Sequence, residues 1–331
     1  MISPARRLKI CLLGQPFWAN RMRRTLIEYA GDEVSVTTLF PQQMPSRVQW
    51  RHVADADLLM RIGFRPGAMT PLGILFDTFW SMLRRVNSRA AGAYYWIGTD
   101  VLNAVREVKA KRTRAPFWRS FQDIHIADAP WLVSELQEAG LAAKQIHFPS
   151  PILKSATIPD LPEKFSVLTY IPERRYRFYA GPAIAEAARR LPNIQFKVVA
   201  GTGQWLKDPP PNLEFLGWQS DMAPLYRNCT VLLRMLEHDA LGATVPEGLC
   251  FARHVIYTYP VPFTNLVANG DVDGLVSTLS DLHARHELGT LRPNLEGWRY
   301  GMTTFSEAQF TAQLVAYLRQ RVKATGVTSL T

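Results

Sequence analysis

The segment HDALGATVPEGLCFARHVIYT, residues 238–258, contains an acidic turn, a glycine-bearing loop, a short helical stretch and an apolar strand, in that order. Thr244 to Glu247 has the spacing of a capping box, with Thr244 as N-cap, Glu247 at position N3 and Pro246 tolerated within the first turn. A helix start preceded by the Gly242 loop also presents unpaired backbone N–H groups, which suit a phosphate. The segment therefore predicts a strand-loop-helix-strand unit, and both interpretations of Glu247 stay open.

Apolar runs of strand length recur along the whole chain and are separated by segments of helical length. Short apolar runs that alternate with helices are typical of parallel sheets covered on both faces. The sequence therefore predicts an α/β protein. The expected strands are residues 8–14, 33–39, 56–63, 93–98, 123–128 and 145–150 in the first half, and 165–171, 194–201, 213–218, 229–236 and 254–258 in the second.

A proline-rich stretch divides the two series of strands. FPSPILKSATIPDLPEK, residues 148–164, contains four prolines and no helical periodicity, which indicates a linker. Two α/β domains of similar size are therefore expected. They are an amino-terminal domain over residues 1–150 and, after a linker over 151–163, a carboxy-terminal domain over 164–304, followed by a helix and tail over 305–331.

The composition fits a globular chain with a substantial core. The chain has 331 residues, of which 47% are hydrophobic, and its three cysteines lie in apolar runs without metal-ligand spacing. We therefore expect reduced thiols and a cytoplasmic location. The longest apolar stretch, residues 70–85, is interrupted by Asp77 and ends in two arginines, so no transmembrane helix is expected.

Positive charge is concentrated in the first half of the chain. The formal net charge is +10; residues 1–150 hold 20 basic and 12 acidic residues, and residues 151–331 hold 18 and 16. Such a field attracts nucleic acid, anionic lipid or an acidic small substrate. Nucleic acid is the least favoured partner, because no reader motif accompanies the charge. Peripheral contact with the inner membrane surface through the basic amino-terminal domain stays open.

Three motifs resemble family 4 glycosyltransferases. RMLEHDALGATVPEGLCFARHVIYT, residues 234–258, is similar to the carboxy-domain signature of that family, in which an acid, a glycine loop and a glutamate eight positions after the acid precede a helix and a strand. Asp239 and Glu247 fall on the two acidic positions. YYWIGTDV (94–101) resembles the amino-domain W-x-G-[ST]-D-V stretch, and VVAGTGQW (198–205) a carboxy-domain strand with its glycine turn. The resemblance implies the GT-B fold, in which two Rossmann-like domains with parallel sheets face each other across a cleft.

The resemblance also implies a nucleotide-sugar donor held mainly by the carboxy-terminal domain, with no cofactor and no metal. Glu247 would accept hydrogen bonds from the donor ribose, and Asp239 from hydroxyls of the donor sugar, because a carboxylate is an acceptor-only group suited to vicinal hydroxyls. Backbone N–H groups near Leu241 and Gly242 would meet the pyrophosphate or sugar. Trp218, at the end of an expected strand, would form part of the base pocket, with packing as the alternative.

A leaving diphosphate needs cations, and YIPERRYRFY, residues 170–179, is a candidate source. The family pattern places an arginine and, five positions later, a lysine on phosphate; here these positions hold Arg174 and Tyr179. Another arginine must then supply the missing positive charge. The candidates for phosphate contact are Arg174, Arg175, Arg177 and Arg234, and of these Arg174 and Arg175 are expected to act in catalysis beside Asp239.

In the amino-terminal domain, the resemblance places Gly14, Gly98 and Asp100 on the side of the sugar and the acceptor. Asp100 also suits the N-cap of a helix over residues 101–110, and both interpretations stay open. His125 lies on an apolar strand and is interpreted as a core histidine with satisfied hydrogen bonds. The single glycine at position 14 is a weak signal by itself, because many strand-to-helix turns need one.

The acidic pairs at residues 55–57 and 271–273 are the only superficial metal motifs in the sequence, and both are interpreted as turn and cap chemistry. No metal site is therefore expected.

The family resemblance implies a metal-independent, retaining GT-B glycosyltransferase. It would move a sugar from a nucleoside diphosphate to a hydroxyl of a glycan or lipid-linked acceptor, in glycan or cell-envelope polysaccharide synthesis. One alternative is a catalytically weak nucleotide-sugar-binding partner protein, motivated by Tyr179 and Asp239 where the family has lysine and glutamate. A nucleotide-sugar epimerase of the same fold is another.

Overall fold

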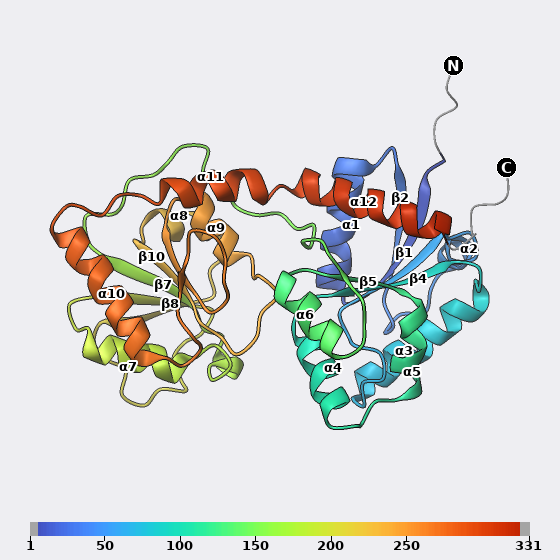
Figure 1. The fold of residues 1–331 in the computed structure, drawn as a ribbon, viewed down its shortest axis with the longest axis horizontal. Coiled ribbons are helices and arrows are strands. Elements are labelled where there is room, and N and C mark those ends of the chain that lie inside the picture. The colour runs from blue at the N-terminus through green and yellow to red at the C-terminus, as the bar shows by residue number, and fades with distance from the viewer. Residues whose placement is uncertain (1–5, 325–331) are drawn as a thin grey trace, which may run out of the picture. The chain divides into compact units, whose positions relative to one another are not determined.

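A computed structural model describes residues 6–324 and divides the chain into two compact units. Unit 1 comprises the chain up to Pro151 together with the segment from Ser306 onward, and unit 2 is Ile152–Phe305. Each unit contains a six-stranded parallel sheet with helices packed on it (Figure 1). The expected α/β architecture of two Rossmann-like domains is confirmed.

In unit 1 the strand order is β2-β1-β3-β4-β5-β6, and the order reverses between β1 and β3. Its elements are β1 (Leu8–Leu13), α1 (Pro16–Ala30), β2 (Val34–Leu39), α2 (Arg47–Ala54), β3 (Leu58–Ile62), α3 (Pro71–Val86), β4 (Ala91–Trp96), α4 (Thr99–Lys109), α5 (Ala115–Arg119), η1 (Ser120–Gln122), β5 (Ile124–Ala127), α6 (Pro130–Glu138), β6 (Lys144–Gln145) and α12 (Glu307–Ala324).

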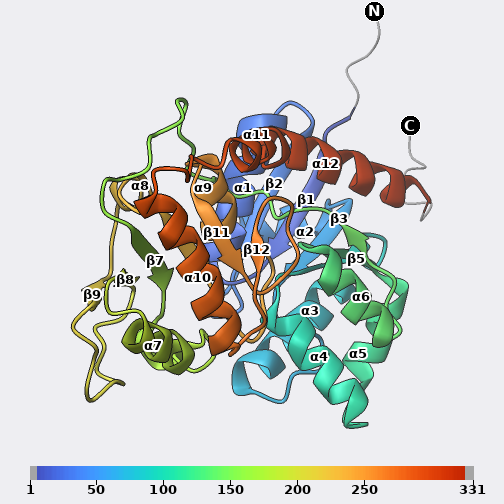
Figure 2. The ribbon, with the colours of Figure 1, turned by 60° about the vertical axis from the view of Figure 1, so that its left-hand side comes forward.

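The carboxy-terminal helix α12 completes the core of unit 1. It packs across α1 (Figure 2), and its apolar face is buried in the same cluster as strand β1. Leu314 and Leu318 on α12 are fully buried with Leu12 of β1 and Met22 of α1. These side chains contact elements about 300 residues earlier in the chain, and their burial stabilises the packing of the carboxy-terminal helix on the amino-terminal strand and helix.

In unit 2 the strand order is β9-β8-β7-β10-β11-β12, and the order reverses between β7 and β10. Its elements are β7 (Ser166–Tyr170), η2 (Glu173–Arg175), α7 (Gly181–Arg190), β8 (Gln195–Val199), β9 (Leu213–Gly217), α8 (Ala223–Arg227), β10 (Val231–Arg234), α9 (Thr244–Cys250), β11 (His254–Tyr257), β12 (Asn265–Leu266), α10 (Val272–Glu287) and α11 (Leu295–Thr304).

The reversal of strand order gives unit 2 a topological switch point. Every strand pair in the sheet is parallel, so the carboxyl ends of β7 and β10 lie at the same edge. In open parallel sheets of this kind, ligands bind outside the carboxyl ends of the strands where the order reverses. The segments that follow β7 and β10 therefore form the candidate ligand site of unit 2.

The proline-rich segment contains no helix or strand between Gln145 and Ser166 and is held on unit 2 from Ile152 onward. The fully buried guanidinium of Arg253 donates hydrogen bonds to the carbonyl oxygens of Pro159, Asp160 (3.0 Å) and Cys229 (3.1 Å). This buried arginine thus fastens the segment to the neighbourhood of α9 and β11. Within residues 6–324, none of the helices combines the length and the apolar character needed to cross a membrane.

Candidate functional site

Side chains from the two central strands of unit 2 converge at the switch point. Tyr179 lies after β7, and two guanidinium groups approach its ring: the Cζ atom of Arg175 at 5.8 Å and that of Arg234, the last residue of β10, at 5.7 Å from the ring centroid. Tyr170 at the end of β7 packs edge-on against the same ring. The position where the resemblance leads one to expect a lysine is therefore flanked by two arginines.

Arg234 forms a buried ion pair with Asp239. Its Nε donates to Oδ2 at 2.5 Å and its Nη2 to Oδ1 at 2.9 Å, and both residues are 8% exposed. Oδ2 also accepts from the Tyr257 hydroxyl at 2.9 Å and from the Gly242 N–H at 3.2 Å. Burial by itself raises the pKa of Asp239, but the Arg234 charge and these donors hold that pKa below its usual value.

The loop from Asp239 to Thr244 wraps around the Arg234 guanidinium. Nη1 of Arg234 donates to the Thr244 hydroxyl at 3.3 Å, so the same group bonds both ends of the loop. Gly242 lies directly against the guanidinium. A Cβ atom at position 242 would lie only 2.8 Å from Nε of Arg234 and would collide with the group. Leu241 has a φ of +64°, an unfavourable conformation for a branched residue.

Glu247 on α9 is buried, and other elements hold its carboxylate. Oε2 accepts from the Tyr226 hydroxyl at 2.6 Å, and Oε1 from the Leu153 N–H at 3.3 Å. The capping-box interpretation is wrong: the N-cap of α9 is Ala243, without a side-chain hydrogen bond, because Thr244 faces Arg234 and Glu247 faces Tyr226. Burial and the neighbouring carboxylate raise the pKa of Tyr226.

The Glu173 carboxylate accepts hydrogen bonds from backbone N–H groups of the turn after β8. Its Oε2 accepts from the N–H groups of Thr202 (2.8 Å) and Gly203 (3.0 Å), and its Oε1 from that of Trp205 (3.1 Å). Desolvation raises the pKa of the Glu173 carboxyl, but the hydrogen bonds from these N–H groups lower it by more. The pKa of Glu173 therefore lies below its usual value. The carboxylate therefore fastens the arginine-bearing turn 173–177 to the glycine turn that follows the neighbouring strand.

The three arginines of that turn have different surroundings. Arg175 stacks on Phe178, with its Cζ 4.0 Å from the ring centroid, and also borders Tyr179. Arg177 is exposed and lies over Tyr176, donating from Nε to the Tyr176 hydroxyl at 3.1 Å. Arg174 and Arg175 are exposed as well. Of the three, Arg175 is the one that lies beside Tyr179 together with Arg234.

Trp218 follows β9, which is separated from β7 by β8. Its side chain is 78% exposed, so it does not pack in the core of unit 2. The preceding Gly217 has a φ of +66° and accepts a hydrogen bond from the N–H of Ala200 in the turn after β8. An exposed indole thus stands beside the turn that Glu173 holds.

The residues expected on the acceptor side all lie at the carboxyl ends of strands in unit 1. Gly14 follows β1, and Gly98 follows β4 with a φ of +113°. Gly98, rather than Asp100, is the N-cap of α4; the Asp100 carboxylate reaches back to the Ile97 N–H at 3.1 Å. The N-cap interpretation of Asp100 is therefore wrong by two residues, because the helix begins at Thr99.

The other sequence interpretations in unit 1 concern packing. His125 is buried on β5; its Nδ1 accepts from Trp96 Nε1 at 3.0 Å and its Nε2 donates to the Ser120 carbonyl at 2.8 Å, which confirms a core histidine with satisfied hydrogen bonds. Asp57 accepts from the Lys9 N–H at 2.9 Å. Across the part of the chain that the structure describes, no group of three His, Cys, Asp or Glu side chains is arranged to hold a metal ion.

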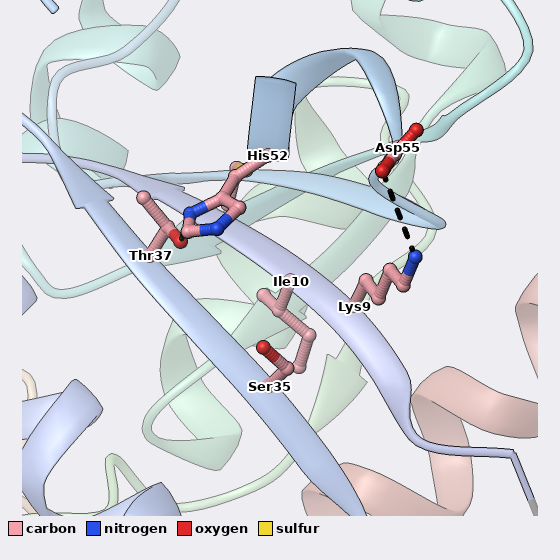
Figure 3. A pocket seen from close by; sticks show the side chains of 7 residues that line it. Lys9, Ile10, Ser35, Thr37, His52 and Asp55 are labelled. Atoms are coloured by element: carbon pink, nitrogen blue, oxygen red, sulfur yellow. Dashed lines mark hydrogen bonds and ion pairs between the residues drawn. The ribbon is translucent and has the colours of Figure 1, made fainter. Parts of the chain in front are cut away.

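A hollow of about 280 Å³ lies over β1 and β2 in unit 1 (Figure 3). Lys9 and Asp55 form a 3.9 Å ion pair at its rim, and the Thr37 hydroxyl bonds His52 Nδ1 at 2.9 Å. Asp55 precedes β3, so the hollow extends toward the amino ends of the strands, away from the edge where such sheets bind ligands. None of the residues expected to bind the donor or the acceptor lines this hollow.

Three residues with a clear place in the site were missed at the level of sequence: Glu173, Tyr226 and Tyr257. A carboxylate just before an arginine run, with a glycine turn on the next strand, was a signal for Glu173. The two tyrosines had no signal, because each meets its carboxylate partner through a fold contact about 20 residues away in the chain.

No protein-family model matches the chain, and no curated protein matches its sequence. Solved structures do match. The sucrose-phosphate synthase of Thermosynechococcus elongatus is 13% identical, with a TM-score of 0.69, over 96% of this chain and 100% of that one. HepE of Anabaena, solved with UDP and glucose, is 12% identical, with a TM-score of 0.65, over 95% and 100%. WaaG, a glycosyltransferase involved in lipopolysaccharide biosynthesis, is 11% identical, with a TM-score of 0.59, over 93% and 99%. At these identities the likeness concerns the fold, and the chain has the two-domain GT-B architecture.

Proposed function

We propose that the protein is a glycosyltransferase that takes its sugar from a nucleoside-diphosphate donor bound by unit 2. The observation that carries the proposal is the convergence of Arg175, the loop wrapped around Arg234 and the buried carboxylate of Glu247 around the switch point of a nucleotide-binding type of sheet. The presence of UDP and glucose in HepE, a protein of the same fold, supports this choice of ligand.

Each part of the cluster suits one part of such a donor. Glu247, held in place by Tyr226, would accept hydrogen bonds from the two ribose hydroxyls. Arg175, with Arg174 beside it in the turn, would contact the diphosphate, whereas the Arg177 guanidinium lies over Tyr176. The backbone of Leu241 and Gly242 would meet the pyrophosphate or the sugar, and the exposed Trp218 offers a face for the base.

In the proposed reaction, the bond between the anomeric carbon and the diphosphate oxygen breaks while a bond to the acceptor hydroxyl oxygen forms. The acceptor proton passes to the departing diphosphate, and the sugar keeps its configuration. Negative charge grows on the diphosphate during this step, so the positive charge of Arg175, whose guanidinium stacks on Phe178, would lower the barrier without a metal ion. The loops that contain Gly14, Gly98 and Asp100 in unit 1 would serve the acceptor.

The acceptor is proposed to be a glycan or a lipid-linked hydroxyl, as in glycan or cell-envelope polysaccharide synthesis. The buried thiols of Cys11 and Cys229, which form no disulfide, fit a cytoplasmic location. A lipid-linked acceptor would bring the basic amino-terminal domain to the inner membrane surface, where anionic headgroups attract it.

A thermal-shift panel of UDP, GDP, ADP and TDP tests the donor class. A nucleotide at about 100 times its dissociation constant stabilises the folded protein by about 2.7 kcal/mol. We expect one base to give the largest shift, and no shift with any of the four would contradict the proposal. Release of the nucleoside diphosphate from the matching nucleotide sugar, with and without a lipid extract, then tests transfer.

A catalytically weak nucleotide-sugar-binding partner protein is the second candidate function. The tyrosine at position 179 favours it, because no cationic side chain stands at that position. Binding in the nucleotide panel without turnover of any nucleotide sugar would support this second candidate.

A further inference from the structure

The Arg234–Asp239 pair stands out because it joins strand β10 to the loop that precedes α9. The carboxylate accepts four hydrogen bonds, two from Arg234 and one each from Tyr257 and Gly242. An acid that contacts a sugar directly needs its oxygens directed at the ligand. Here the four hydrogen bonds come from Arg234 on β10, from Tyr257 on β11 and from Gly242 in the loop itself.

The loop depends on this pair for its shape. Arg234 bonds its first residue, Asp239, and its last, Thr244, and the guanidinium fills the space in front of Gly242. Leu241, between them, has a left-handed φ of +64°, which persists only when the surroundings determine it. If the guanidinium moves, both bonds are lost and the Leu241–Gly242 backbone can relax.

We propose that Arg234 and Asp239 are positioning residues that hold the Leu241–Gly242 backbone in the shape that receives the donor diphosphate, and that Asp239 does not itself bind the donor sugar. This inference rests on the proposed function. It assigns Asp239 a different place from the direct sugar contact that the sequence resemblance implies.

The proposal distinguishes ligands with and without a sugar. A positioning defect lowers the affinity for the nucleoside diphosphate and for the nucleotide sugar by the same factor, because both ligands need the loop. Loss of a direct sugar contact weakens only the nucleotide sugar. A change confined to scaffold stability lowers the unfolding temperature and leaves both dissociation constants of the folded protein unchanged.

The test uses calorimetric titration of the full chain with the nucleoside diphosphate selected by the panel and with its glucose conjugate. The variants are Asp239→Asn, Arg234→Gln, their double mutant and Gly242→Ala. We expect each single variant to lower the affinity for both ligands about tenfold or more, with an unchanged ratio of the two affinities. The double mutant should bind no more weakly than the weaker-binding single variant, because Arg234 and Asp239 act as one unit.

The exposed ion pair between Arg190 and Asp273, with N–O distance 2.7 Å, supplies matched controls in unit 2. Arg190→Gln and Asp273→Asn should leave both affinities unchanged. If Asp239→Asn does not fold, Tyr257→Phe takes its place, since it removes one donor to the same oxygen and leaves both charges.

Two results would overturn the inference while leaving the proposed function intact. One is a variant at position 239 that weakens only the nucleotide sugar; the other is a set of variants that change thermal unfolding and neither affinity. Failure of the unmodified protein to bind any nucleoside diphosphate would overturn the proposed function and this inference with it.

Discussion

The Tyr226 hydroxyl donates a 2.6 Å hydrogen bond to Oε2 of Glu247, and both side chains are buried. The pair joins α8 to α9, and it fixes the direction of a carboxylate that the helix itself does not use for capping. A carboxylate oriented in this way can discriminate between ligands by their hydroxyl groups.

Glu247→Ala should therefore abolish discrimination between a ribonucleoside diphosphate and its 2′-deoxy form. In the unmodified protein the ribo form should bind about tenfold or more tightly, because a hydrogen bond to a charged group contributes about 1.5–3 kcal/mol. Tyr226→Phe should reduce the preference partly. Calorimetric titration with both forms measures it, and Glu186→Ala, on the exposed side of α7, is the control. An unchanged preference in Glu247→Ala would show that the carboxylate does not contact the ribose.

Arg175→Gln should weaken a nucleoside diphosphate about tenfold or more and leave the affinity for the free nucleoside unchanged. The reason is that Arg175 borders the ring of Tyr179, which Arg234 also approaches, where the phosphates are expected. Arg177→Gln is a matched control in the same turn, because that guanidinium lies over Tyr176 instead. Equal losses in the two variants would indicate a diffuse effect of charge rather than a contact by Arg175.

Glu173→Gln should loosen the arginine-bearing turn from the turn after β8. Hydrogen exchange should accelerate at the amides of Thr202, Gly203 and Trp205, which donate to this carboxylate. The folded-state pKa of Glu173 lies below its ordinary value of 4.5, so its stabilising contribution is complete above pH 4.5 and is lost as the pH falls through the folded pKa. Unchanged exchange at these three amides would mean that the turn holds its shape without the carboxylate.

Asp123 and His125 should make opposite contributions to the pH dependence of unit 1. Burial lowers the pKa of His125 from 6.5 to about 4, so its contribution is present above pH 6.5 and is lost as the pH falls toward 4. Burial, only partly offset by Arg84, raises the pKa of Asp123 from 3.8 to about 6, so its contribution is present below 3.8 and is lost as the pH rises through 6.

The variant Asp123→Asn separates the two titrations. It should stabilise unit 1 at pH 7 by at most about 3 kcal/mol, the equivalent of its pKa shift, and this gain should vanish near pH 4. Urea denaturation at pH 7, 5.5 and 4, read from the protection of the β4 and β5 amides, measures the difference. A difference that does not vary with pH would contradict the assignment to Asp123.

The strands were predictable because their residues form apolar runs bounded by turns. Eleven of the twelve strands observed within residues 6–324 overlap an expected one, and the strand that was not expected, β12, consists only of Asn265 and Leu266, which form no apolar run. The two-domain α/β architecture was likewise predictable, since a proline-rich segment separates two series of apolar runs, whereas the GT-B fold was expected from the family resemblance.

The contacts of the candidate site could not be predicted from the sequence. Arg234, Asp239 and Glu247 could be selected from their order in the chain, but a sequence pattern does not show whether a carboxylate faces a ligand or a tyrosine. The failed capping-box prediction has the same origin: Thr244 and Glu247 have the right spacing, but Arg234 and Tyr226 offer stronger partners from other elements.

Unit 1 is discontinuous in the chain, since α12 joins it only after the whole of unit 2 has intervened. During synthesis, the partners of Leu314 and Leu318 on β1 and α1 therefore leave the ribosome about 300 residues before the helix that covers them. Unit 2 is continuous and can complete its own sheet first. The nascent chain thus holds an uncovered apolar face through most of translation, and a fragment that ends at Pro151 would keep that face permanently, which makes it a candidate for chaperone binding or aggregation.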